Sequence, residues 1–159
     1  MKHLFWAMRV GFGATVAVGA AAAVMVSAQA SPSTAARLGV HSSEYGRALF
    51  GPSGKVVYLF GADRGSASRC YGACAKAWPP LLTTAAPLAG SGVDAKLLGT
   101  TKRTDGTMQV TYNRHPLYYY YEDTPTKIMC QHANMHGGLW FIDKPNGQPN
   151  MAKGMMKMK

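Results

Sequence analysis

The sequence predicts an all-β, mostly antiparallel fold in which two pseudo-symmetric repeats form one small domain behind an N-terminal signal peptide. Three observations support this fold class. The chain has 159 residues, which leaves room for one domain of ordinary size. Its aromatic and β-branched runs alternate with turn-forming residues, as expected for short strands. One pattern of residues also occurs twice in the same register, which indicates an internal duplication.

Residues 1–30 have the layout of a secretory signal peptide. Two basic residues precede an uncharged apolar run at residues 10–26, and the small residues of Ser-Ala-Gln-Ala follow it. This order predicts export, with cleavage after Ala30. An uncleaved membrane anchor is the alternative, although the apolar run is slightly shorter than the ~20 residues of a membrane span.

Export leaves a basic chain with a flexible segment predicted at each end. The full sequence has 17 Lys and Arg against 7 Asp and Glu, so loss of the two basic residues in the signal peptide leaves a net charge of +8. Residues 31–38 are small and polar and predict a flexible leader. Residues 151–159 contain four Met and three Lys and predict a flexible tail. The duplicated β-repeat domain is therefore expected at residues 39–150.

Two stretches of the chain share a pattern of aromatic, acidic, cysteine and tryptophan residues. The spacing from Tyr to Asp is five residues in both copies, and from Tyr to Cys it is twelve. Repeat one covers about residues 45–84, and repeat two about residues 103–147. The matched positions are Tyr58, Phe60, Asp63, Cys70 and Trp78 in the first copy, and Tyr118, Tyr120, Asp123, Cys130 and Trp140 in the second.

Each repeat contains a predicted β-hairpin. The first has strands at residues 47–50 and 55–60 around a turn at 51–54. The second has strands at residues 108–112 and 116–121 around a turn at 113–116. A closing strand at 139–142 ends at the turn formers of 144–147. Short helices are expected only at 74–78 and 93–98.

The two motif aspartates, Asp63 and Asp123, have two interpretations. A pair of carboxylates could act as acid and base or hold a hard cation. Alternatively, each caps the turn after its strand by accepting backbone N–H groups, which is favoured because a duplication preserves structural parts. The motif aromatics are expected to pack in the core. Tyr119 and Tyr121 should point to the opposite side.

Three cysteines, Cys70, Cys74 and Cys130, are an odd number for an exported chain. A disulfide between the first two, or from one of them to Cys130, would stabilise a small secreted domain by about 2–4 kcal/mol. The alternative is a copper site, since thiolate and imidazole ligands suit that metal. The oxidising compartment favours a disulfide.

A second candidate metal site lies near the third cysteine. His132, Met135 and His136 could converge on a soft metal, with Cys130 completing the ligand shell. This would make the chain a periplasmic copper-binding or thiol-redox protein. Copper is the cofactor that these residues suggest. A hydrolase built on the two aspartates is a third hypothesis. No motif of a known catalytic class occurs in the sequence, so the chain is not expected to be an enzyme.

These residues resemble a family of bacterial secreted proteins and lipoproteins of unknown function that share a Tyr-x-aromatic-x-x-Asp repeat. The matching elements are Tyr58-x-Phe60-x-x-Asp63, Tyr118-x-Tyr120-x-x-Asp123 and the segment from Cys70 to Leu81. The resemblance covers most of residues 39–147 and implies an extracytoplasmic location and a repeated β unit. It implies no catalytic residue. This chain lacks the lipid-modified Cys of many members, and residues 127–136 replace a Gly-rich stretch.

The sequence therefore predicts an exported, non-enzymatic protein that acts by binding in the cell envelope or periplasm. Its basic surface favours an acidic surface or an unknown envelope component as partner. Export argues against nucleic acid as the ligand, and no stable membrane span is expected to remain after cleavage.

Overall fold

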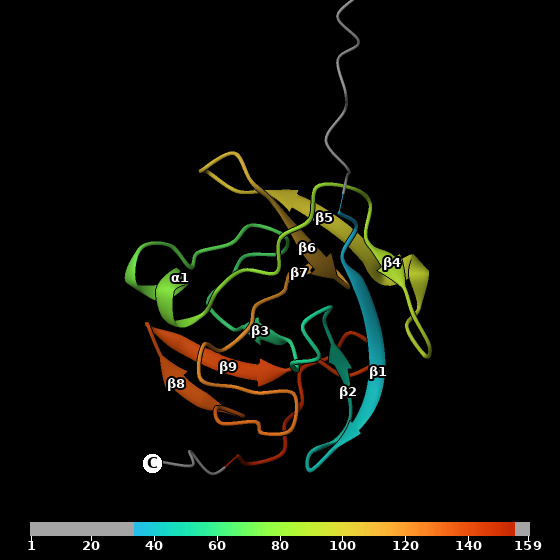
Figure 1. Ribbon diagram of the computed structural model, residues 1–159. Helices are drawn as coiled ribbons and strands as arrows, with labels where there is room; N and C mark the ends of the chain where they lie inside the picture. The colour runs from blue at the N-terminus through green and yellow to red at the C-terminus, as the bar shows by residue number, and fades with distance from the viewer. Residues whose placement is uncertain (1–33, 155–159) are drawn as a thin grey trace, which may run out of the picture. The chain divides into compact units, whose positions relative to one another are not determined.

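The computed structural model describes residues 34–154 (Figure 1), so the predicted signal peptide lies outside the described residues. These residues form three small sheets. The first has the order β2-β1-β4, with β1 (Arg37–Ser43), β2 (Gly46–Phe50) and β4 (Leu88–Ala89). The second has the order β3-β9-β8, with β3 (Tyr58–Phe60), β9 (Gly138–Ile142) and β8 (Ala133–Met135). The third has the order β5-β6-β7, with β5 (Leu98–Lys102), β6 (Met108–Tyr112) and β7 (His115–Pro116).

The all-β prediction is confirmed, and its two expected helical segments are both short. Helix α1 (Ala73–Ala77) and the 3-10 turn η1 (Ala95–Leu97) fall in the segments predicted for helices. Every strand pair within the three sheets is antiparallel except β1 with β4. Among the described residues, no helix is long and apolar enough to cross a membrane.

Each repeat opens with a two-stranded hairpin and so begins before the predicted starts near residues 45 and 103. In the first, Gly39 of β1 lies opposite Phe50 of β2. In the second, Gly99 of β5 lies opposite Thr111 of β6. Gly39 and Gly99 lie 60 residues apart, as the motif tyrosines do, whereas their partners lie 61 residues apart. The two hairpins therefore differ in register by one residue.

The predicted flexible leader differs from the structure in its described part. Arg37 and Leu38 belong to β1 and pair in parallel with Leu88 and Ala89 of β4. Leu38 is completely buried. Burial of this side chain and the β4 pairing explain why the chain is ordered before residue 39, where the domain was expected to begin.

The first predicted hairpin forms its turn and only a short stretch of its pairing. Gly51 N–H donates to Lys55 O, and Phe50 forms an isolated antiparallel bridge with Val56. Beyond this bridge, β3 pairs with the distant strand β9. Similarly, the predicted strand at 116–121 is reduced to β7 and an isolated bridge at Tyr118. The closing strand is confirmed as β9.

Strand β3 separates two hydrophobic clusters. Tyr58 and Phe60 face a cluster that contains both motif tryptophans, whereas Val57 and Leu59 face a cluster of aliphatic side chains from β1, β2 and β6. A strand buried on both faces carries a continuous apolar run. This explains why residues 56–60 lack the polar alternation of a half-exposed strand.

The cysteine pairing is resolved by the structure. Cys70 and Cys74 form a disulfide that closes the turn into α1, and their Cα atoms lie 5.2 Å apart. Cys130 is a free, buried thiol. Pairing of Cys130 with either of the others, which the sequence left open, does not occur.

We expect the double variant Cys70→Ala/Cys74→Ala to lose about 2 kcal/mol of unfolding free energy, because the crosslink closes only a short loop in the unfolded chain. Urea unfolding followed by tryptophan fluorescence measures this loss. Cys130→Ala is the matched control, and alkylation of the denatured, unreduced protein should modify one thiol. Two or three modified thiols would contradict the pairing.

Candidate functional site

The two motif tyrosines meet at the centre of the fold. Tyr58 N–H donates to Tyr118 O at 2.8 Å, and Tyr118 N–H donates to Tyr58 O at 3.0 Å. The hydroxyl of each tyrosine donates to the motif aspartate of the other repeat. Tyr58 Oη donates to Asp123 Oδ2 at 2.6 Å, and Tyr118 Oη donates to Asp63 Oδ2 at 2.8 Å. Each repeat therefore supplies the donor for the carboxyl of the other.

The second oxygen of each carboxyl caps the turn that follows it. Asp63 Oδ1 accepts the N–H of Arg69 at 2.7 Å, and Asp123 Oδ1 accepts the N–H of Met129 at 2.9 Å. This confirms turn capping. The carboxyls are held separately, and no hydrogen bond joins them within residues 34–154. Neither lines the cavities described below, so the acid–base pair required for a hydrolase is not supported.

The motif aromatics form a stack in the core. Trp78 and Trp140 are parallel, with ring centroids 3.9 Å apart and planes at 4°. Tyr58 packs edge-on against Trp78, and Tyr118 packs edge-on against Trp140. Both tryptophans and both tyrosines are completely buried. These rings are a packing unit and offer no exposed surface to a ligand.

A buried arginine breaks the symmetry of the two repeats. Arg103 donates from Nη1 to Ser68 Oγ at 3.0 Å and to Gln109 Oε1 at 2.7 Å, and from Nη2 to Cys70 O at 2.8 Å. By the 60-residue spacing of the motif tyrosines, the position equivalent to Arg103 in repeat one is Ser43. The guanidinium therefore ties the 65–70 turn to its neighbouring hairpin at a position where repeat one has a serine.

The candidate metal ligands lie in different surroundings. His132 packs its ring against Phe141, His136 is exposed, and Cys130 is buried. Burial raises the pKa of the Cys130 thiol to about 11, which disfavours the thiolate that binds metals. Within the described part of the chain, no group of three or more His, Cys, Asp or Glu side chains could hold a metal ion. The copper hypothesis is therefore not supported.

The start of the predicted tail is also anchored. Gln131 is buried, and its Nε2 donates to Asn150 O at 2.7 Å and to Ala152 O at 2.9 Å. The domain thus holds the chain past residue 150. Residues 155–159, with the other three methionines of the tail, lie outside the described residues.

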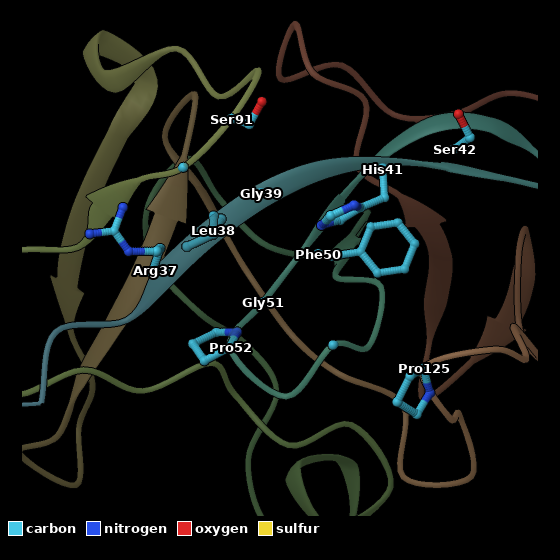
Figure 2. Close-up of a pocket in the computed structure, with 12 residues that line it drawn as sticks. Arg37, Leu38, Gly39, His41, Ser42, Phe50, Gly51, Pro52, Ser91 and Pro125 are labelled. Atoms are coloured by element: carbon cyan, nitrogen blue, oxygen red, sulfur yellow. The ribbon is translucent and has the colours of Figure 1, made fainter.

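A cavity that the sequence did not predict lies on the solvent-facing side of β1 (Figure 2). Its volume is about 730 Å³. Figure 2 shows Arg37 at one side of the cavity, His41 and Phe50 together near the middle, and Pro52 and Pro125 both on the lower side of β1. The imidazole packs edge-on against the Phe50 ring, with centroids 5.3 Å apart. The cavity therefore joins a cation and an imidazole to apolar walls.

The cavity exists because a glycine interrupts a row of side chains. Arg37, Gly39 and His41 alternate along the outer face of β1, and Gly39 leaves a gap between its neighbours. A Cβ at Gly39 would lie 3.1 Å from Nε2 of His41. Gly51 also lines the cavity. A larger residue would not fit at this position, because its Cβ would overlap the Tyr119 hydroxyl. No strand was predicted here from the sequence, although the polar–apolar alternation at residues 37–41 is a signal typical of one.

We expect Tyr58→Phe to lower the free energy of unfolding by about 2–3 kcal/mol and Tyr118→Phe by about 1 kcal/mol. Asp123 is buried and would lose its hydroxyl donor, whereas water can reach the half-buried Asp63. Urea unfolding near neutral pH compares the two variants. Equal losses, or a larger loss for Tyr118→Phe, would contradict the assignment.

Burial raises the pKa of Asp123 to about 6 in the folded protein, above its ordinary value near 4. The folded state therefore binds this proton more tightly than the unfolded state does. The contribution to stability is present below about pH 4 and is lost as the pH rises through about 6. We expect the stability of the wild type relative to Asp123→Asn to fall by roughly 2–3 kcal/mol over that window.

Urea unfolding of both proteins across this pH range measures the change. Asp143, whose pKa burial also raises, is present in both proteins, so the difference isolates Asp123. Asp63→Asn should show the same direction with a smaller change, because Asp63 is half-buried. A difference that stays constant or grows as the pH rises would contradict the prediction.

A family model described as a secreted repeat of unknown function matches the chain twice, at residues 39–82 and 99–142. No curated protein and no solved structure matches the chain. The two matched segments begin 60 residues apart, as do the two motif tyrosines, and together they cover more than half of the sequence. The family description agrees with an exported protein. The chain therefore belongs to this family of secreted repeats of unknown function and carries two copies of the repeat.

Proposed function

We propose that this protein is a non-enzymatic binding protein of the cell envelope or periplasm, and that the cavity on β1 is its ligand site. One observation carries the proposal: an exposed arginine stands at the side of a cavity with apolar walls. Ligand sites usually combine an apolar lining with a few polar groups that fix orientation. The repeat motif itself is committed to the core and leaves this surface as the place for binding.

The chemistry of the cavity favours a ring-bearing carboxylate. The Arg37 guanidinium is exposed, and its hydrogen bond to Ala89 O is long, at 3.4 Å from Nη1. Its planar fork matches the two oxygens of a carboxylate. Phe50, Pro52 and Pro125 provide flat apolar faces for the body of the ligand. The basic net charge also attracts anions to the surface.

The same lining supports binding without catalysis. His41 lines the cavity next to Ser42 in the chain, but its ring packs against Phe50. No Asp or Glu is among the residues that line this cavity, so none is placed there to orient the imidazole as a general base.

We also propose that the protein is exported through its predicted signal peptide. Cleavage after Ala30 would release a chain that begins at Ser31, with a single duplicated β-repeat domain. Its partner would be an acidic component of the envelope, reached either in the periplasm or outside the cell.

We expect glucuronate and benzoate, two ring-bearing carboxylates, to shift the NMR amide signals of Gly39, His41 and Gly51 in the purified protein. Glucose serves as the uncharged probe and should shift them much less. Arg37→Gln should weaken carboxylate binding about tenfold, because a charge-assisted hydrogen bond is lost. Titration of the amide shifts measures each affinity.

Gly39→Val tests the cavity itself, since the branched side chain suits a strand and fills the gap beside His41. It should abolish the shifts without unfolding the protein. Lys76→Gln removes an exposed charge on α1 and should leave binding unchanged. Shifts that map elsewhere, or that persist in Gly39→Val, would refute the proposed site.

A further inference from the structure

A second cavity continues the first one. It has a volume of about 480 Å³ and shares Ser42, Phe50 and Pro125 with the cavity on β1. Its other walls come from the end of β1 and from the turn that follows Asp123. They are Ser43, Glu44, Thr126, Lys127 and Ile128. The two cavities therefore form one groove along the outer face of β1.

The groove is long enough for a linear ligand. It begins at Arg37, the first residue of β1, and passes Ser43, the last. Seven residues of strand extend for about 20 Å. A single small carboxylate at Arg37 would leave the second cavity unused.

Both ends of the groove carry an exposed basic side chain. Arg37 lies in the first cavity and Lys127 in the second. Glu44 also lines the second cavity, so the local charge there is more balanced and Arg37 provides the stronger attraction. A ligand that bears negative charges at intervals would satisfy both ends.

Beside the first cavity, the groove offers side chains and not a free strand edge. Strand β1 pairs with β2 along one edge. Along the other edge, Arg37 and Leu38 pair with β4, and Val40 N–H donates to Ser91 O where β4 ends. An extended peptide would require main-chain partners on an open edge. Instead, the second cavity presents hydroxyls from Ser42 and Thr126, which suit a ligand rich in hydroxyl groups.

The equivalent space in repeat two is filled. By the 60-residue spacing of the repeats, Arg103 and Ser68, which hydrogen-bond to each other, occupy the positions of Ser43 and Ile128. The Arg103 guanidinium is buried there. The opening beside Ser43 is thus a difference between two copies of one repeat and not a consequence of the fold.

Resting on the proposed binding function, we infer that the groove binds an acidic polysaccharide, with one sugar carboxylate at Arg37 and a later one at Lys127. The sugar rings lie against Phe50, Pro52 and Pro125, and their hydroxyls face the second cavity. The ligand is a linear chain of uronic acid residues or a polymer of the same chemistry.

Isothermal titration calorimetry with a hexamer of galacturonate, its monomer and the neutral hexamer maltohexaose tests this inference on the purified protein. We expect the acidic hexamer to bind at least about tenfold more tightly than the monomer, because a second contact adds to the first. Raising the salt from about 0.05 to 0.3 M should weaken its binding.

The variants separate the two ends of the groove. Lys127→Gln should weaken the acidic hexamer several-fold and leave the monomer unchanged, whereas Arg37→Gln should weaken both. Lys76→Gln is the control, because it removes the same single positive charge at a residue that does not line the groove. The inference is overturned if the acidic hexamer does not bind, if maltohexaose binds as tightly, or if Lys127→Gln leaves the hexamer unaffected. In those cases the proposed function still stands when small carboxylates map to the first cavity, and fails when they do not.

Discussion

The rest of the structure depends on two hydrogen bonds between the repeats. In each, the motif tyrosine of one repeat donates its hydroxyl proton to the motif aspartate of the other. Asp123 is buried, and its donors are the hydroxyl of Tyr58 and a backbone N–H of its own turn. A repeat on its own would bury a carboxyl without the hydroxyl that satisfies it, at a cost of several kcal/mol. The duplication is therefore a requirement of the fold, because each copy completes the other.

The same hydrogen bonds between the repeats also position the walls of the groove. Its floor and one wall come from β1 and β2 in repeat one, but Pro125 and Lys127 belong to the turn that follows Asp123 in repeat two. Tyr58 holds Asp123, and Asp123 holds the end of that turn through Met129 N–H. The structural motif thus positions the binding surface without contacting a ligand. This explains how a motif can be buried in the core and still be needed for function.

Local patterns predicted much of this fold, and non-local pairing accounts for what they missed. The duplication, the capping role of Asp63 and the short helices follow from spacing and residue type within a few positions. The pairing of β3 with β9, and of Arg37 and Leu38 with β4, joins segments far apart in sequence and leaves no local signal. The cavity was missed for another reason, because it arises from the absence of a side chain at Gly39.

The contact between a hairpin and the turn that follows a motif aspartate occurs at two ends of the domain, and its residues differ between these ends. At one end, Arg103 ties the 65–70 turn to its hairpin, and the disulfide from Cys70 closes the segment that follows. At the other end Ser43 replaces the arginine, and Asn134 stands where Cys74 would be matched, so Cys130 has no partner. A ligand that bridges Arg37 and Lys127 would supply the connection there that a guanidinium and a disulfide supply at the closed end.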